Sequence, residues 1–264
     1  MIYCNLKGGL GNILFQIATG ISFAKDKKTT FSIPNYEWHL HYLNIEKERN
    51  PILNHANEYS FYFRNLKKEK SPEHLKTLHY PFTFFEDSEL NDNCIIDGYF
   101  QSEKYFKHHR KEILKQFGLP FKLKVKTLFK YPFFTKSRLT SIHVRRGEYL
   151  ISPIHYNQNM KYYDDSINKL DSITDKFVVF SDDIVWCKEN FIGEKFLFIE
   201  NEKDYIEIYL MSICTNNIIC NSSFSWWGAW LNDHANKKVI APENWFKTDE
   251  LSAVDLIPES WNIL

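Results

Sequence analysis

Short hydrophobic runs alternate with helical patterns along the C-terminal half of the chain. Runs of strand length predict strands at 139–145, 177–182, 196–200, 218–221 and 238–241. Patterns with helical spacing lie between them, at 159–170, 204–214 and 223–232. Strands that alternate with helices indicate a parallel sheet covered by helices on both faces.

The N-terminal half begins in the same way. Residues 2–6 are expected to form a strand and 8–11 a glycine turn, and a helix should follow from about Asn12. A further strand is expected at 94–100, with a helix near 103–116 behind it. The whole pattern therefore predicts an α/β protein.

The length of 264 residues suffices for one large domain or two compact ones. We place two lobes at 1–130 and 131–264. Their boundary falls in 118–137, a stretch with prolines and basic residues that we interpret as the crossover between the halves. The segment 35–92 is rich in charge, histidine and aromatic residues and shows no clear periodicity.

The charge balance argues against a nucleic-acid-binding protein. Lys+Arg and Asp+Glu number 33 each, whereas a nucleic-acid binder usually carries a basic excess. An anionic ligand must therefore be held by a few placed cations.

The cysteines and the lack of a long apolar run indicate in which cellular compartment the protein is expected. The five cysteines are scattered without a CxxC pair, which favours buried reduced thiols. No apolar run reaches 18 residues, and residues 1–7 lack the layout of a signal peptide. We expect a cytoplasmic protein without a transmembrane segment, and the oligomeric state stays open.

Polar residues follow the predicted strands at their carboxyl ends. These residues are Arg145-Arg146-Gly147-Glu148, Ser181-Asp182-Asp183, Asn221-Ser222-Ser223 and Pro242-Glu243-Asn244. Because ligands of open α/β sheets bind outside this edge, the convergence is the layout of a binding site. Loops are polar in any protein, but that does not account for an arginine pair.

The arginine pair suits a diphosphate. A guanidinium at a strand end can hold a diphosphate with two hydrogen bonds and neutralise it as it departs. Strand alternation sends Arg145 and Arg146 to opposite sides, so we expect one of them to face the ligand. The alternative is a structural salt bridge with Glu148 or Asp182.

Ser222 and Ser223 begin the predicted helix 223–232. A serine there lies beside free backbone N–H groups, which together form a phosphate site. The alternative is plain helix capping. Three tryptophans of this helix lie at helical spacing, and we interpret them as packing between helix and sheet: Trp226, Trp227 and Trp230.

The glycine turn Gly8-Gly9-Leu10-Gly11-Asn12 lacks the third glycine of a dinucleotide fingerprint. It still brings backbone close to a ligand at a helix start, with Asn12 projecting towards that ligand. No D-x-D triplet occurs, and the scattered histidines show no ligand spacing, so we expect no metal; these are His39, His41, His108 and His109.

Four segments together resemble the α-1,2-fucosyltransferases of glycosyltransferase family 11. They are Gly8–Asn12 with Phe15-Gln16, Asp97–Ser102, His143–Tyr149 and Asn221–Trp230. The resemblance implies a GT-B-like fold of two Rossmann-like lobes with a cleft between them, the N-terminal lobe being reduced at this length. It also implies GDP-β-L-fucose as donor, no metal or other cofactor, and inversion to an α linkage. The family usually shows Asp where Glu148 stands and Gln where Ile13 stands.

The resemblance also implies roles for the lobes and residues. The lobe 1–130 would hold the acceptor glycan and 131–264 the donor nucleotide. The implied catalytic residues are Arg146, Asn12 and Glu148, with Asp182 as a further candidate base. The implied donor-binding residues are Gly9, Gly11, His143, Arg145, Arg146, Asp182, Asp183, Ser222, Ser223 and Phe224.

The expected reaction is transfer of L-fucose to the 2-hydroxyl of a terminal galactoside. Two alternatives remain. The donor could carry another sugar, such as rhamnose or galactose, or the chain could be a non-catalytic carbohydrate-binding module on the same fold.

Overall fold

The computed structural model describes residues 1–35, 58–86, 90–248 and 251–264, and the chain forms two compact units. Unit 1 comprises Met1–Gly118 with Val254–Pro258, and unit 2 comprises Leu119–Ala253 with Glu259–Leu264. The division lies at Gly118, twelve residues before the boundary expected from sequence (130 − 118 = 12).

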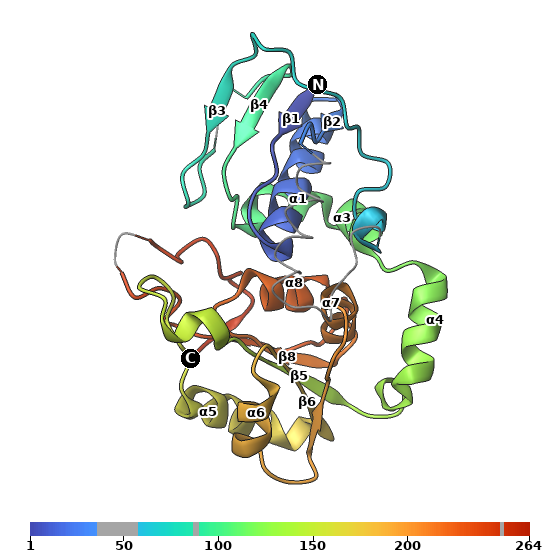
Figure 1. Cartoon of the computed structure of the whole chain (residues 1–264), viewed down its shortest axis with the longest axis vertical. Helices are drawn as coiled ribbons and strands as arrows, with labels where there is room; N and C mark the ends of the chain where they lie inside the picture. Colours follow the sequence, from blue (N-terminus) through green and yellow to red (C-terminus); the bar gives the residue numbers. More distant parts are fainter. Residues whose placement is uncertain (36–57, 87–89, 249–250) are drawn as a thin grey trace. The chain divides into compact units, whose positions relative to one another are not determined.

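Unit 1 is built on a small parallel sheet with the strand order β2-β1-β4-β3. Helix α1 (Leu10–Asp26) packs against β1 and β2 (Figure 1). The strands are β1 (Ile2–Cys4), β2 (Phe31–Ser32), β3 (Thr77–His79) and β4 (Cys94–Asp97). The other helical segments are η1 (Glu58–Phe61), η2 (Glu103–Tyr105), η3 (Lys107–His109) and α3 (Arg110–Phe117). The expected first strand, first helix and strand near 94 are confirmed, whereas the helix expected at 103–116 is broken into η2, η3 and α3.

Unit 2 contains a larger parallel sheet with the order β10-β9-β8-β5-β6-β7. The strands are β5 (Leu139–Val144), β6 (Lys176–Ser181), β7 (Phe196–Phe198), β8 (Asn216–Ile218), β9 (Val239–Ala241) and β10 (Asn262–Ile263). Numbered from β5 as first, this is the 3-2-1-4-5-6 order of doubly wound nucleotide-binding folds. The α/β class and the parallel sheets expected from sequence are confirmed, and the switch point lies between β5 and β8.

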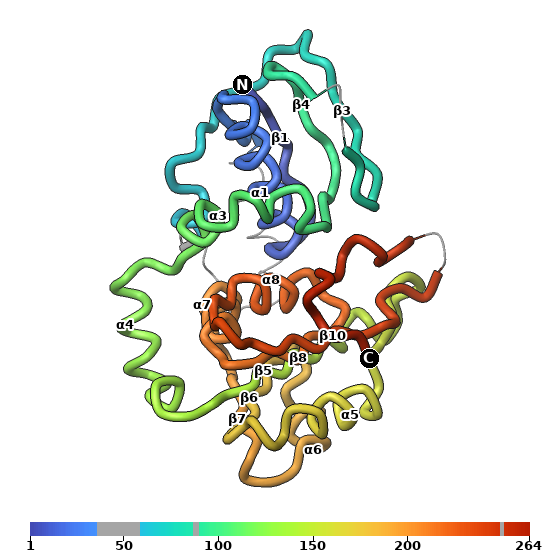
Figure 2. The backbone as a smooth tube through the Cα atoms, turned by 180° about the vertical axis from the view of Figure 1, so that it is seen from behind, coloured from blue at the N-terminus to red at the C-terminus, as the bar shows by residue number. Residues whose placement is uncertain are grey.

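Helices cover both faces of the sheet in unit 2. Figure 2 shows α7 (Asp204–Ser212) and α8 (Ser223–Leu231) over one face, with α5 (Met160–Leu170) and α6 (Ile184–Asn190) over the other. The remaining segments are α4 (Phe121–Lys130), η4 (Pro132–Thr135), η5 (Gly147–Leu150) and η6 (Asp171–Ile173). The stretch interpreted as a crossover therefore contains a helix, α4.

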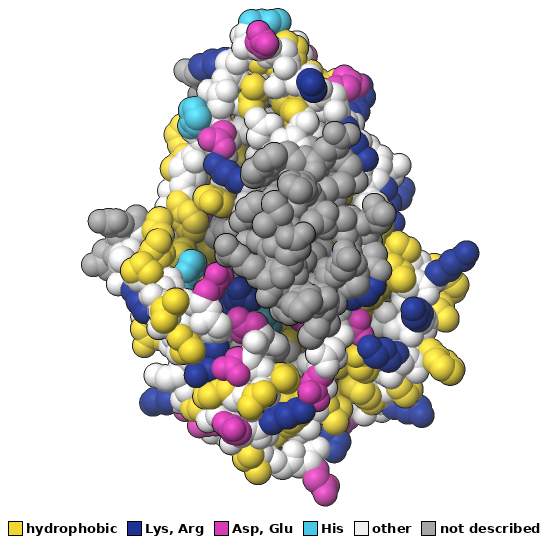
Figure 3. Space-filling view, in the orientation of Figure 1, with side chains coloured by type: hydrophobic (Ala, Val, Ile, Leu, Met, Phe, Trp, Pro, Cys, Tyr) yellow, Lys and Arg dark blue, Asp and Glu magenta, His cyan; other side chains and the backbone are white. Residues whose placement is uncertain are grey.

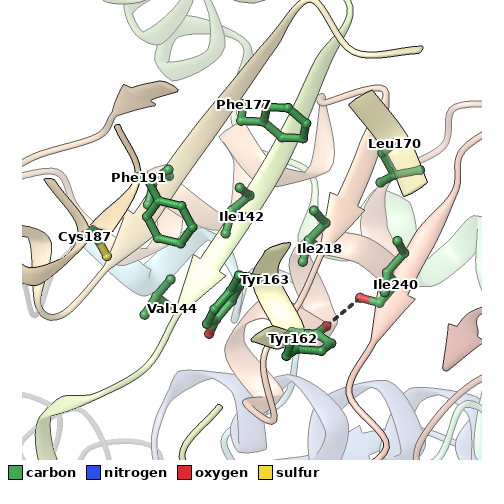
Figure 4. Packing of buried hydrophobic residues seen from close by; sticks show 11 residues of the cluster. Ile142, Val144, Tyr162, Tyr163, Leu170, Phe177, Cys187, Phe191, Ile218 and Ile240 are labelled. Atoms are coloured by element: carbon green, nitrogen blue, oxygen red, sulfur yellow. Dashed lines mark hydrogen bonds between the residues drawn. The ribbon is translucent and has the colours of Figure 1, made fainter. Parts of the chain in front are cut away.

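The core under α5 and α6 aligns the edge of the sheet. Figure 4 shows Ile142 and Val144 of β5 packed among the side chains of α5, α6 and the neighbouring strands. The Tyr162 hydroxyl donates hydrogen bonds to the carbonyl oxygens of Ile219 at 2.5 Å and Ile240 at 3.3 Å. These bonds fix α5 to the chain just after β8 and to β9.

The strand expected at 218–221 is displaced, since β8 spans Asn216–Ile218. Asn216 and Asn217 are buried in the strand because their amides are hydrogen-bonded. Asn217 Nδ2 donates to Ser141 Oγ at 2.7 Å and to the Met211 carbonyl at 2.8 Å. A search for apolar runs misses a strand whose buried residues are polar but paired.

Two further expectations concern the thiols and the membrane. All five cysteines are buried and form no disulfide, as expected. Among the described residues, no helix has the length and apolar character needed to cross a bilayer.

Candidate functional site

The carboxyl ends of β5, β6 and β8 are neighbours in unit 2, because β5 pairs with both other strands. The turn after β5 carries the arginines, the turn after β6 the aspartates, and the segment after β8 the serines. His143 of β5 links the first and last of these. Its Nδ1 lies 3.1 Å from Cys220 Sγ, and its ring centroid lies 5.3 Å from that of Phe224.

The side chains of the two arginines, which both follow the end of β5, have different partners. The guanidinium of Arg145 uses both terminal nitrogens within the protein, with Nη2 2.9 Å from Glu148 Oε1 and Nη1 3.2 Å from Asp182 Oδ2. The structural ion pair considered as the alternative is therefore present at Arg145.

Arg146 is held differently. Its Nε donates to Asp183 Oδ2 at 3.1 Å, and its Cζ lies 4.0 Å from the centroid of the Trp186 ring. The side chain is 17% exposed, and neither Nη atom is hydrogen-bonded to any residue that the structure describes. Asp183 and Trp186 thus hold the guanidinium in place, while the N–H groups of its two terminal nitrogens remain available to a ligand.

The aspartates position these arginines. Asp183 is the N-cap of α6, where its Oδ1 accepts from the Trp186 N–H at 3.2 Å. Asp182 Oδ1 accepts from the Arg146 N–H at 2.9 Å. A Cβ at Gly147 would lie 2.6 Å from Asp182 Oδ2, so glycine is needed for this approach.

The serines divide into a cap and an open hydroxyl. Ser222 is the N-cap of α8, with Oγ accepting from the Phe224 N–H at 3.3 Å, and it is buried. Ser223 is half-buried, and within the described part of the chain its hydroxyl makes no hydrogen bond. Ser222 therefore caps helix α8. The hydroxyl of Ser223 remains available to donate a hydrogen bond, and it lies beside backbone N–H groups of the first helical turn that have no partner within the helix. The tryptophans expected to be core are buried.

His143 and Glu148 have contrasting surroundings. Burial, aided by the charge of Arg145, lowers the pKa of His143 to about 3, so its imidazole is neutral. The side chain of Glu148 is 71% exposed, and its charge is paired with Arg145. Glu148 therefore lies at the surface of this edge.

The glycine turn of unit 1 lies after β1, next to the carboxyl end of β4. Gly8 has φ +81°, and a Cβ there would lie 2.6 Å from Asn12 Nδ2. Asn12 Oδ1 accepts from Gln101 Nε2 at 2.6 Å. Gln16 exchanges two hydrogen bonds with the backbone of Lys7, which holds the turn in place.

The other two glycines of this turn differ from Gly8. Gly9 is the N-cap of α1, and its absent Cβ would meet no described atom within 4 Å, whereas Gly11 is buried inside the helix. The structure thus places Gly9, Gly11 and Asn12 together in unit 1, and the remaining expected residues in unit 2.

Two residues of this region escaped the sequence analysis. Trp186 stacks on Arg146, which no spacing in the sequence could indicate. Glu207 is an acid flanked by Ile206 and Ile208 in α7, and that apolar setting was a usable signal. Burial, with the charges of Asp204, Glu202 and Asp182 adding to it, raises the pKa of Glu207 well above its usual range.

The raised pKa of Glu207 predicts how the stability of the folded protein depends on pH. The folded protein binds this proton more tightly than the unfolded chain, so stability is full at pH below the ordinary glutamate pKa of about 4.3 and falls as pH rises towards the folded pKa. Glu207→Gln mimics the protonated acid, so its melting temperature relative to wild type should rise between pH 5 and pH 8. The exposed Glu189→Gln is the control, and a pH-independent difference for Glu207→Gln would contradict the prediction.

Asp26, His108 and His109 form a group that could hold a metal ion, with their ligand atoms within 4.8 Å of one another. The sequence hid this group because Asp26 is far from the histidines along the chain. It lies at the C-terminal end of α1, roughly 20 Å along the helix from Asn12. A metal bound there would be distant from the glycine turn. His39 and His41 lie outside the described residues.

The fold and this edge of the sheet define an α/β protein of the doubly wound, nucleotide-binding type. A family model described as glycosyl transferase family 11 matches residues 1–264, and the chain belongs to this family. It is therefore a glycosyltransferase.

Two Escherichia coli proteins are similar over their whole length. An α-1,2-colitosyltransferase is 31% identical over 292 residues, covering 99% of this chain and 98% of the relative. The O-antigen biosynthesis glycosyltransferase WbnK is 29% identical over 304 residues, covering 98% of this chain and 99% of the relative.

Among solved structures, the chain is similar to NodZ, an α-1,6-fucosyltransferase from Bradyrhizobium. The crystal soaked with GDP-fucose aligns with a TM-score of 0.53 at 14% identity, covering 87% of this chain and 92% of that one. This likeness confirms the GT-B type of fold expected from the sequence.

Proposed function

We propose that this glycosyltransferase transfers L-fucose from GDP-β-L-fucose to the 2-hydroxyl of a terminal galactoside, with inversion. The observation that carries the proposal is Arg146. Its two terminal nitrogens make no hydrogen bond within the described protein, and it lies in the turn after β5, the strand that pairs with β8, which the open helix start of α8 follows. Anionic ligands bind at such helix starts and strand ends.

In this proposal unit 2 holds the nucleotide diphosphate. Arg146 donates from both Nη atoms to the phosphates, while the Ser223 hydroxyl and the N-terminal N–H groups of α8 supply further donors. Arg145, Asp182 and Asp183 are positioning residues, because they touch Arg146 or its backbone or complete the turn. Neutral His143 packs beside Phe224, where a protonated imidazole would disturb the packing.

The reaction proceeds by attack of the acceptor hydroxyl on the anomeric carbon as the bond to GDP breaks. The proton of the attacking hydroxyl passes to water, and the electron pair of the broken bond leaves with GDP, so that negative charge grows on the departing diphosphate. Preorganised donors aimed at such a charge commonly contribute more to catalysis than any other single effect. Among the candidate bases, Glu148 is exposed and paired with Arg145, both carboxylate oxygens of Asp182 are engaged by the arginine pair, and the Asn12 amide cannot accept the proton. We therefore assign Asn12, with Gly9, to positioning the sugar.

Transfer of colitose is a second candidate, because the 31% identical relative is a colitosyltransferase. Colitose is fucose without its 3-hydroxyl group. A site that hydrogen-bonds this hydroxyl rejects the deoxy sugar by about 10⁴-fold or more, whereas a site without such a contact discriminates little. The α-1,2 linkage in the name of that relative supports the acceptor position proposed here.

The test is GDP release and product analysis with GDP-fucose, GDP-colitose, GDP-mannose and UDP-galactose, using β-galactosides as acceptors. We expect the highest kcat/KM with GDP-fucose and an α-1,2 linkage by NMR. A preference for GDP-colitose would show that colitose, not fucose, is the sugar transferred. A preference for UDP-galactose would contradict the proposal that the donor is a guanine nucleotide sugar. If the protein binds GDP but produces no GDP from any of the four donors, it would be a carbohydrate-binding module without transferase activity.

We expect transfer to persist in excess EDTA. The arginine and the helix start can stabilise the diphosphate without an ion, and no D-x-D triplet occurs in the chain. The measurement is initial rate after dialysis against EDTA, with and without added Mg²⁺ or Mn²⁺. Loss of activity that Mg²⁺ or Mn²⁺ restores would show that a metal completes the donor site.

A further inference from the structure

Helix α4 carries an exposed apolar stripe on the outside of unit 2. Phe121 is 79% exposed, Val125 51% and Phe129 90%. Their spacing of four residues places them on one face of the helix. Exposed phenylalanines are costly in water, and two on one helix face mark a surface that contacts something apolar.

Lysines lie beside this stripe. Lys122, Lys126 and Lys130 follow the apolar residues by one position each, so they form the adjacent face, and all three are exposed. The helix contains a fourth lysine, Lys124, and no acidic residue. Lys122 and Lys126 make no ion pair with any part of the chain that the structure describes.

The opposite face anchors α4 to the body of unit 2. Thr127 is buried, and Lys124 Nζ lies 5.8 Å from the centroid of the Tyr209 ring. At the C-terminal end of the helix, Lys130 of the exposed lysine face is also ion-paired, with its Nζ 2.5 Å from Glu202 Oε2. The helix is thus held by its inner face, and the apolar stripe is presented outward. In the orientation of Figure 1, Figure 3 shows hydrophobic and basic side chains interleaved where α4 lies.

We propose that α4 binds the surface of a membrane that contains anionic lipids. A short helix with an exposed apolar face and flanking lysines lies in the interface plane, with its aromatic side chains among the acyl chains and its lysines at the head groups. At ten residues α4 is about 15 Å long, too short to cross a hydrocarbon core of about 30 Å. Nucleic acid would use the lysines but leave the phenylalanines exposed.

Such binding would bring the proposed transferase close to acceptor glycans that are attached to a membrane surface. This consequence rests on the proposed function, whereas the binding itself does not. The charge of the whole chain is balanced, so the attraction must come from this local group of lysines.

The test is flotation of the full-length protein with vesicles of phosphatidylethanolamine and phosphatidylglycerol (3:1), and with pure phosphatidylcholine. We expect binding to the anionic vesicles that weakens as salt rises, because surface charges are screened. Lys122→Glu/Lys126→Glu should weaken it at least ten-fold, since each lysine near an anionic surface changes the affinity by roughly five-fold. Phe121→Ser/Phe129→Ser should abolish it.

Matched controls separate this helix from general surface properties. Lys107→Glu/Lys111→Glu makes the same charge change at exposed positions of unit 1, and Ile192→Ser/Val254→Ser removes two other exposed apolar side chains. Both should float like wild type. All α4 variants should keep the wild-type rate of GDP release with a water-soluble acceptor, which also shows that they fold.

Three results would overturn the proposal. One is equal flotation of wild type and the phenylalanine variant. Another is equal loss of binding in the controls. The third is a dimer, measured by sedimentation without lipid, that Phe121→Ser/Phe129→Ser dissociates while wild type fails to bind vesicles, since the stripe would then be an interface between two copies.

Discussion

Arg146→Lys should lower kcat by ~100-fold or more, the loss typical for removal of one donor that stabilises the transition state. Lysine keeps the positive charge but cannot donate one hydrogen bond to Asp183 and present a planar pair of donors at the same time. It also loses the flat contact with the Trp186 ring. The measurement is single-turnover GDP release with saturating donor, together with calorimetric GDP affinity.

The control for this variant is Arg138→Lys. Arg138 lies just before β5, at its opposite end, where it is exposed and paired with Asp175. Its replacement should leave kcat within about two-fold, because exposed ion pairs contribute little. Wild-type turnover by a folded Arg146→Lys protein would remove Arg146 from the site. The diphosphate would then have to be held elsewhere.

Ser222→Ala and Ser223→Ala should separate stability from donor binding. Loss of the N-cap at Ser222 should cost about 1 kcal/mol of stability, which is roughly 2–4 °C in melting temperature. Loss of the Ser223 hydroxyl removes a hydrogen bond to a charged phosphate, worth about 1.5–3 kcal/mol. The GDP dissociation constant of Ser223→Ala should therefore rise about ten-fold or more, with its melting temperature unchanged.

The pair is its own control, since the two serines are adjacent and the substitution is the same. Calorimetric GDP titration and thermal melting of both variants separate the two effects. Unchanged GDP affinity in both variants, with lowered stability in either, would make this segment scaffold alone. It would also count against nucleotide binding by unit 2.

The sequence was sufficient for the class of fold and for the edge of the sheet that carries the polar groups. The apolar run of β6 located that strand closely because its buried residues are hydrophobic, and β5 was located by its Leu139, Ile142 and Val144. The same logic displaced β8, whose Asn216 and Asn217 are buried by virtue of hydrogen bonds to Thr140, Ser141 and Met211. A pattern of hydrophobicity cannot distinguish a paired polar side chain from a solvated one.

Interactions between near neighbours along the chain could also be considered from the sequence. Helix capping was the alternative weighed against a phosphate site at Ser222 and Ser223, and the structure shows this cap at Ser222. Strand alternation predicts that one of Arg145 and Arg146 faces the ligand, and this stays a prediction. Capping could be weighed from the sequence because it depends on near neighbours along the chain.

Only the tertiary structure decided which arginine uses its terminal nitrogens in ion pairs within the protein. Asp182 and Asp183 are 36 and 37 residues from Arg146, and they reach it because β5 pairs with β6. The contact of Trp186 with Arg146 and the raised pKa of Glu207 likewise depend on how α6 and α7 pack. The sequence by itself determined the residue types at the edge of the sheet. Their partners, and hence which donors stay open, follow from strand pairing, which brings together residues that no spacing connects.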